Sequence, residues 1–310
     1  MKRQRIYLLL FPALLLVSGC SDSDCSEPEQ VPIELHAQGN ATVETKADQT
    51  ITEAFATTVF ASMRSGDYTG LTSPVNAKEW KIDTEVQTNG TVPLSGNPTY
   101  PENGDWLYLI AVAPQASSYS DNDGKVTYTL TGQTDLMYAS QISGSRWDGN
   151  HFVPLTYKHL LTQLTFKAMK KVTGGLSVKV KKITVTTTNS VTLALTNGET
   201  SFSGSGELSL ELPDGGTEIS GTTATPLSGS LLLPPLTGTS DAYKLTVETS
   251  IGTFKDLEIT PQSDGGNLSF AGGTSHEITL NIGDKELGIS SVTVSGWVPV
   301  IQNDDLNLVE

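Results

Sequence analysis

Side chains suited to catalysis or metal binding are few in this sequence, and their spacing matches no common catalytic motif. The 310 residues include two cysteines and four histidines. No histidine lies in an HExxH motif or at the i, i+4 spacing of a zinc-binding helix, and no Gly-x-Ser-x-Gly elbow or phosphate loop is present. We therefore predict no enzymatic activity, metal or cofactor, while a pair of catalytic carboxylates distant in sequence stays open. The histidines are His36, His151, His159 and His276.

One acidic segment has the composition of a calcium loop. It reads Asp121-Asn122-Asp123-Gly124, but Gly132 stands where an EF-hand needs its bidentate glutamate. Asp-Gly and Asn-Gly pairs supply the positive φ angles of tight hairpins, so we predict a turn here.

Tryptophans offer a second kind of ligand site, since a row of exposed indoles can stack on sugars. Three of the four lie beside apolar residues and are predicted to pack in the core. Trp147, between Arg146 and Asp148, is the exception and the residue to test for ligand contact. The other three are Trp80, Trp106 and Trp297.

The charge of the chain excludes one broad class of function. Lys and Arg number 19 against 34 Asp and Glu, which gives a net charge of −15. Neutralising nucleic-acid phosphates requires clustered Lys and Arg, so nucleic-acid binding is excluded as the main function.

The N-terminus has the layout of a secretory signal. Basic residues 1–5 precede an apolar stretch at 6–17, which is too short for a permanent transmembrane helix. Its end, Leu16-Val17-Ser18-Gly19-Cys20, resembles the lipobox of bacterial lipoproteins. That resemblance implies a signal peptide at 1–19, acylation of Cys20 and a stable lipid anchor. An ordinary cleaved signal is the alternative.

Residues 20–30 are predicted to be an acidic tether. The run from Ser21 to Glu29 resembles the surface-export signals of Bacteroidota lipoproteins, and a segment this polar does not fold. With Cys20 acylated, Cys25 has no partner, so we expect neither a disulfide nor a cysteine-ligated metal in the body.

Beyond residue 30 the apolar residues alternate with polar ones, which is typical of β-strands with one buried face. The period-two runs include residues 178–180, 191–195, 208–212, 245–247, 257–259 and 278–282. Residues 106–113 form a near-continuous apolar run and predict a central buried strand. The best helical windows, 73–80 and 157–164, are short. The sequence therefore predicts an all-β protein.

The pattern breaks near residues 143–151, where Gly144, Gly149 and Asn150 interrupt it. We place a boundary there and predict two tandem β-sandwich domains, residues 31–150 and 151–310, each large enough for its own core. A single large sandwich remains the alternative.

Several segments taken in order resemble the fimbrillin family of Bacteroidota, the type V pilins and their relatives. The segments are residues 135–139, 153–166, 180–185 and 278–280, followed by Trp297. His159 matches the family histidine of an F-x-H-x-L stretch, although Tyr157 stands where Phe is usual. We interpret His159 as a packed, hydrogen-bonded residue at a strand start.

The resemblance implies two transthyretin-like, Greek-key sandwich domains and the role of a fimbrial subunit involved in adhesion. Such subunits reach the outer membrane surface as lipoproteins, and a trypsin-like protease then removes the first strand. A strand from a neighbouring subunit fills the vacated groove, giving a head-to-tail polymer. Here residues 31–43 are the expected first strand, and residues 298–310 are a candidate donor.

The expected cleavage site departs from the family. Thr45-Lys46-Ala47 stands where a Thr-Arg-Ala sequence is usual, so Lys46 is the candidate site of maturation. The body has two other arginines, Arg64 and Arg146. Of these, Arg64 is predicted to lie inside a strand. Either a lysine-tolerant protease acts, or the chain stays uncut and anchored. An uncut chain would suit a fimbrial anchor or a surface lipoprotein that binds glycans or host ligands.

Overall fold

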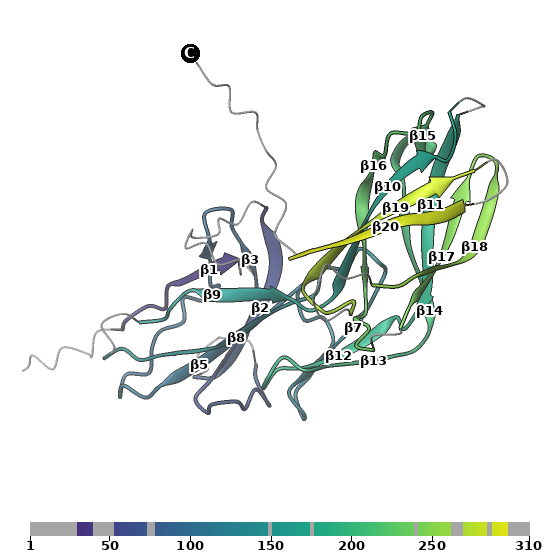
Figure 1. The fold of residues 1–310 in the computed structure, drawn as a ribbon. Coiled ribbons are helices and arrows are strands. Elements are labelled where there is room, and N and C mark those ends of the chain that lie inside the picture. The colour runs from purple at the N-terminus through teal and green to yellow at the C-terminus, as the bar shows by residue number, and fades with distance from the viewer. Residues whose placement is uncertain are drawn as a thin grey trace, which may run out of the picture. The chain divides into compact units, whose positions relative to one another are not determined.

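The computed structural model describes residues 30–39, 53–72, 78–147, 151–173, 177–238, 241–261, 269–283 and 287–296. Within them nearly all regular structure is β-strand, and the only helix is one 3-10 turn at Pro213–Gly215 (Figure 1). The all-β prediction is confirmed. The helical window at 157–164 is wrong, since it falls in two strands, and of the window at 73–80 only residues 78–80 are described, with Trp80 opening a strand.

A seven-stranded sheet holds the N-terminal strands in the order β3-β2-β5-β8-β9-β1-β4. All its pairings are antiparallel except that of β1 with β9, which is parallel. The strands are β1 (Leu35–Gly39), β2 (Phe55–Ser62), β3 (Trp80–Val86), β4 (Thr91–Val92), β5 (Leu107–Ala113), β8 (Met137–Gly144) and β9 (Leu155–His159).

The central strands of this sheet are buried on both faces. Along β5, Leu109 and Ala111 enter one hydrophobic cluster, while Ile110 and Val112 enter another. In β2, Phe60 likewise faces one cluster and its neighbour Val59 the other. A strand covered on both faces needs a continuous apolar run rather than alternation. This explains the apolar run at 106–113 and confirms its prediction as a central buried strand.

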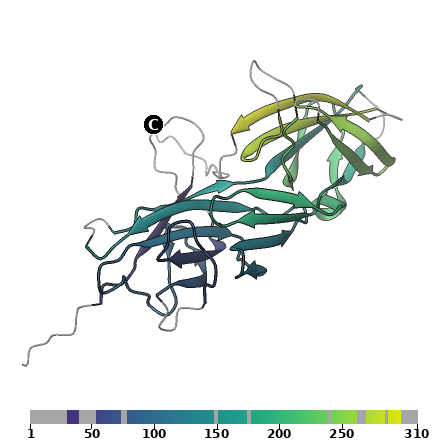
Figure 2. The ribbon, with the colours of Figure 1, turned by 90° about the horizontal axis from the view of Figure 1, so that it is seen from below.

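Two further sheets face each other as a β-sandwich. One has the order β16-β10-β19-β20, and the other the order β14-β11-β17-β18 with β15 also on β11. Figure 2 shows the yellow strands β19 and β20 in one layer and green strands in the other. Phe166 and Ile278 from the first sheet and Ile183 and Val247 from the second share one core. The strands are β10 (Thr162–Lys170), β11 (Val178–Thr187), β14 (Gly206–Glu211), β15 (Thr217–Ile219), β16 (Thr225–Leu233), β17 (Tyr243–Thr249), β18 (Gly252–Ile259), β19 (Thr274–Ile282) and β20 (Leu287–Gly296).

A fourth sheet joins segments from both sides of residue 150. Its order is β13-β12-β7-β6, and β7 pairs with β12 through Val126 opposite Leu193 and Tyr128 opposite Val191. Strand β9 likewise belongs to the seven-stranded sheet although it follows residue 150. The division at residue 150 stays a prediction, and any such division has to accommodate these pairings. The strands are β6 (Tyr119–Ser120), β7 (Lys125–Thr129), β12 (Ser190–Ala194) and β13 (Thr200–Ser203).

The edge strand β18 carries features that oppose further strand pairing. Its register with β17 shifts between Leu245 and Val247, and Asp256 adopts a positive φ of 55°. Lys255 and Asp256 are exposed along this bulge. Bulges and charged side chains are devices by which natural sheets block edge-to-edge association.

Candidate functional site

Strand β1 occupies an interior position of the seven-stranded sheet. Its last residues pair with β9, Ala37 opposite Leu155, and its first residues pair with β4, Leu35 opposite Val92. The strand therefore has a hydrogen-bonded neighbour on each side. We call the position between β9 and β4 the β1 slot.

The side chains of this segment alternate between the core and solvent. Ile33, Leu35 and Ala37 are 6%, 3% and 8% exposed, while Glu34 and His36 are exposed. Val31 packs against the same cluster from its margin. The predicted inward alternation of Val31, Ile33 and Leu35 is thus confirmed.

Backbone contacts outside the strand pairing extend the slot ahead of β1 and reinforce its centre. Ile33 N–H donates to Pro98 O at 2.9 Å, and Tyr100 N–H donates to Val31 O at 3.0 Å. Near the centre, Ala37 N–H donates to Gly90 O at 2.7 Å. Gly90 has φ 79°, and a Cβ there would lie 2.7 Å from Ala37 O, so the close approach requires glycine.

The floor of the slot on the β9 side is polar but fully satisfied. The Tyr157 hydroxyl lies 2.8 Å from Thr57 Oγ1, and Thr57 Oγ1 also donates to Val112 O at 2.7 Å. Phe55 contacts the Tyr157 ring edge-on at a centroid distance of 5.1 Å. Burial raises the pKa of Tyr157 well above its ordinary value, so the phenol stays protonated. This arrangement positions strands and offers no acid–base group.

His159 is placed at the end of β9 and not at a strand start, which corrects that part of its prediction. Its Nδ1 lies 2.8 Å from Asp135 Oδ1, and its side chain is 13% exposed. The predicted packed and hydrogen-bonded state is confirmed. The pair ties β9 to the segment that leads into β8 (Met137–Gly144).

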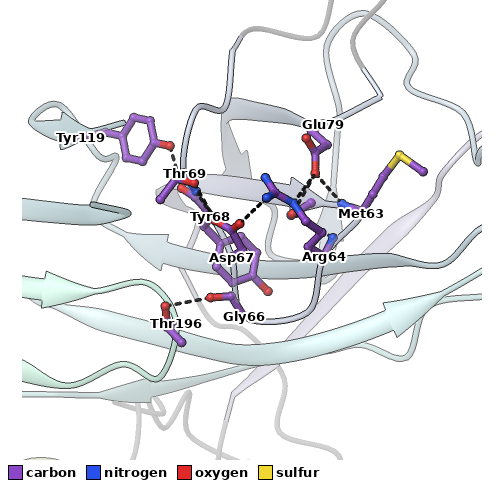
Figure 3. A network of polar contacts seen from close by, with 10 residues as sticks. Met63, Arg64, Gly66, Asp67, Tyr68, Thr69, Glu79, Tyr119 and Thr196 are labelled. Atoms are coloured by element: carbon purple, nitrogen blue, oxygen red, sulfur yellow. Dashed lines mark hydrogen bonds and ion pairs between the residues drawn. The ribbon is translucent and has the colours of Figure 1, made fainter. Parts of the chain in front are cut away.

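A network of polar contacts follows β2 and joins it to distant strands (Figure 3). Arg64 lies beyond the end of β2, so its predicted position inside a strand is wrong. Arg64 Nη1 lies 2.8 Å from Asp67 Oδ2, and the two side chains point toward each other in Figure 3. Hydrogen bonds from the Thr69 hydroxyl and amide hold the pKa of Asp67 below its ordinary value, against the effect of desolvation. Glu79 accepts from Met63 N–H at 2.9 Å.

The same loop is fastened at three further points. Tyr119 OH donates to Tyr68 O at 2.7 Å, and Thr196 Oγ1 donates to Gly66 O at 2.9 Å. The Gln141 carboxamide oxygen accepts from Gly66 N–H and from Tyr68 OH, at 2.8 and 2.9 Å. The network therefore links the loop after β2 with β6, with β8 and with the turn after β12. Its role is structural, since its hydrogen bonds and ion pair hold the backbone and side chains of this loop in place.

We expect the Gln141→Ala variant to lower the free energy of unfolding by about 1–2 kcal/mol, because the loop loses three partially exposed hydrogen bonds at once. Those bonds include one from Gln141 Nε2 to Ser65 Oγ. Urea unfolding followed by circular dichroism measures the change. Gln115→Ala is the matched control, since this exposed glutamine donates one bond, to Thr84 O. Equal stability of the two variants would contradict a fastening role for Gln141.

The sequence-predicted site residues divide into two groups. Cys20, Lys46, Trp297 and the candidate donor at 298–310 lie outside the described residues. Of the tryptophans within them, Trp80 is 1% exposed as predicted, and Trp147 is 70% exposed. Trp106 is 45% exposed, so its predicted place in the core is wrong.

Neither a metal centre nor a membrane-spanning helix emerges in the described part of the chain. There, no three His, Cys, Asp or Glu side chains come together as a possible ion site. The segment Asp121–Gly124 forms the predicted turn, between β6 and β7. Of the described residues, none belongs to a helix with the length and apolar character needed to cross a bilayer.

The sequence matches one known protein family over most of its length. A model of the fimbrillin-like family matches residues 36–297, which is most of the chain. The chain belongs to the fimbrillin-like family. Membership confirms the resemblance inferred from the sequence and indicates a structural rather than an enzymatic protein. Among curated proteins none matches.

Solved structures share the fold of this fimbrillin-like chain. A candidate cell adhesion protein from Bacteroides uniformis superposes with a TM-score of 0.57 at 15% identity, covering 86% of this chain and 99% of that one. A fimbrial protein from Bacteroides vulgatus gives 0.51 at 14% identity, covering 86% and 99%. A candidate adhesin from Bacteroides thetaiotaomicron gives 0.52 at 10% identity, covering 87% and 98%. At such identities the likeness concerns the fold alone.

Proposed function

We propose that this fimbrillin-like protein is a structural subunit of a surface fimbrium that contributes to adhesion. The chain is exported as a lipoprotein acylated at Cys20 and sits at the outer membrane surface. Its partners are other fimbrial subunits, added head to tail, and surface ligands of host or bacterial cells. The adhesion and fimbrial proteins that share its fold support this role.

The observation that carries the proposal is the position of β1. The strand is interior, with β9 on one side and β4 on the other, yet it comes from the extreme N-terminal part of the described chain. Lys46 follows it in sequence and precedes β2. One cut after Lys46 would therefore detach β1 from the rest of the chain without breaking any other strand of the described residues.

Loss of β1 supplies a physical reason for assembly. Its removal leaves unpaired those backbone N–H and C=O groups of β9 and β4 that had faced β1. It also empties the apolar positions that the side chains of Ile33, Leu35 and Ala37 had filled. An extended strand from a second subunit satisfies these groups and fills the apolar positions. Because donor and acceptor are different surfaces, the contact does not close and a filament grows.

Two substitutions in the native host test the proposal. We expect Lys46→Ala to keep the N-terminal segment attached and to abolish filaments, whereas Lys46→Arg should preserve them. Mass spectrometry of surface filaments should give Ala47 as the N-terminus. We expect Cys20→Ala to abolish partition into the outer membrane, since a membrane-bound chain requires its acyl anchor. Filaments of normal abundance from Lys46→Ala cells, with the segment still attached, would overturn strand exchange.

A further inference from the structure

Exposed apolar side chains gather at one end of three neighbouring strands. Trp106, Trp147 and Val153 are 45%, 70% and 57% exposed. Trp106 precedes β5, whose first residue Leu107 pairs with Gly144 at the end of β8. Gly144 in turn lies against Phe152, beside Val153 at the entry to β9. Strands β5, β8 and β9 run side by side in the sheet (Figure 1).

The indole of Trp147 is held in place although most of it meets solvent. It rests on Gly104, which has φ 79°, and a Cβ at that position would overlap the indole Nε1. Ser145 Oγ donates to Gly104 O at 2.8 Å and fixes the two segments together. The Arg146 guanidinium lies over the Trp147 ring at 4.6 Å and donates to Glu102 O at 3.0 Å. Exposing a large, fixed indole contributes little to folding, which points to a ligand.

Exposed polar side chains flank Gly104, the residue against which this indole packs. Residues 101–106 bring exposed Glu102, Asn103 and Asp105 next to Gly104. Asn103 Nδ2 donates to Asp105 Oδ2 at 2.7 Å, and Asp105 N–H donates to Asn103 Oδ1 at 3.2 Å, so this turn is ordered. These exposed side chains offer carboxylate and amide oxygens as hydrogen-bond acceptors.

We propose that Trp147 and Trp106 form a platform that binds neutral pyranose units of a glycan. The C–H groups on one face of a pyranose carry partial positive charge and stack on the negative face of an indole, at Trp147 the face opposite Arg146. The hydroxyl groups at the ring edge then hydrogen-bond to the exposed acidic and amide side chains of residues 102–105. Two indoles and one valine cover far less than the ~800 Å² per partner of a stable protein interface, which favours a small ligand.

This binding site gives a chemical class to the surface ligands of the proposed function, but it does not depend on filament assembly, because a single uncut subunit carries it whole. The test therefore uses the full chain and needs no filament. Calorimetric titration with cellotetraose, maltotetraose, mannotetraose and chitotetraose provides the neutral probes, and oligogalacturonate provides an anionic one. We expect at least one neutral tetrasaccharide to bind and to protect tryptophan fluorescence from acrylamide quenching.

Substitutions then assign the binding to the platform. Trp147→Ala should weaken the affinity about tenfold, as expected for loss of one aromatic stack, while Trp147→Phe should weaken it less. Both should melt within a degree or two of wild type, since the side chain is 70% exposed. Ile251→Ala, at an exposed apolar residue of the β17–β18 turn, is the matched control and should bind as wild type.

Three outcomes would overturn the platform. The first is that no tetrasaccharide binds the full chain. The second is that Trp147→Ala binds as tightly as wild type. The third is binding of oligogalacturonate alone that is lost in Arg146→Gln and kept in Trp147→Ala, because the ligand would then be recognised by charge and not by stacking.

Discussion

Separated from residues 1–46, the remaining chain is expected to unfold at a markedly lower temperature and to self-associate. The detached segment takes with it the buried side chains of Ile33, Leu35 and Ala37. Burying a large aliphatic side chain is worth ~1.5–3 kcal/mol, so the loss is on the order of 5 kcal/mol. Typical domains are stable by only ~5–15 kcal/mol. The emptied slot also exposes the backbone of β9 and β4, which favours association through strand pairing.

The experiment needs a cut at one place only. Arg64 is 63% exposed, so trypsin would have a second target within the loop after β2. A recognition sequence for a site-specific protease, inserted at Lys46, avoids this. The fragments must be separated in mild denaturant and the body refolded, because a nicked β1 can stay in its slot. The nicked but unseparated chain is the control.

Calorimetry and light scattering then report melting temperature and size. A synthetic peptide covering residues 298–310 should restore part of the stability if that segment acts as donor. A separated body as stable and as monomeric as the nicked control would show that residues 31–46 are only a tether. Strand exchange would then lose its physical basis in this chain.

Acidification is expected to destabilise the sandwich through His276. This histidine lies on β19 and is 0% exposed. Its Nε2 lies 2.9 Å from Thr274 Oγ1, its ring contacts Phe270 at 4.6 Å, and its buried Nδ1 has no hydrogen-bond partner among the described residues. Burial lowers its pKa from 6.5 to about 4.

The sign of the effect follows from the two pKa values. Between pH 6.5 and 4 the unfolded chain binds a proton at His276 and the folded chain does not, so stability falls as the pH falls. Across that window the loss from this one group is about 2–3 kcal/mol, and below pH 4 it adds nothing further. Urea unfolding at half-unit pH steps measures the slope.

A matched pair of variants isolates this histidine from the acidic residues that titrate nearby in pH. His276→Leu should flatten the dependence between pH 6.5 and 4, whatever its effect on absolute stability. His36→Leu changes an exposed histidine of β1 and should leave the slope unchanged. An unaltered slope in His276→Leu would mean that the folded core admits the protonated ring.

The fold class was predictable because alternation is a local property of the sequence. Val178 and Val180 on β11, and Ile278 and Leu280 on β19, are buried at the positions where period two places them. Which distant strands pair with each other, by contrast, cannot be read from a local pattern. The partnerships of β7 with β12 and of β1 with β9 join strands with many others between them. Their residues carry no mark of the partner, so a boundary predicted near residue 150 from the sequence pattern takes no account of these pairings.

Two errors have identifiable physical causes. The spacing of Tyr157, Leu161 and Leu164 is typical of a helix. However, Tyr157 belongs to β9, which ends at His159, and Leu164 belongs to β10, which begins at Thr162. The helix-like spacing therefore spans two strands and the short connection between them. Trp106 adjoins an apolar run, yet it precedes the first residue of β5 and lies where the core ends. The charged neighbours of Trp147 in the sequence predict that its side chain is exposed. Its contact with Gly104 joins segments distant in sequence and becomes visible only in the folded structure.

The bulged edge of β18 affects whether neighbouring filaments would associate side by side. Subunits joined end to end present the same edge many times along a fibre, and a flat, uncharged edge repeated in this way would join neighbouring fibres side by side. Asp256 and Lys255 interrupt that edge in every subunit. Fibres built from this chain should therefore remain thin and separate along β18, leaving the faces of each subunit open to the surroundings.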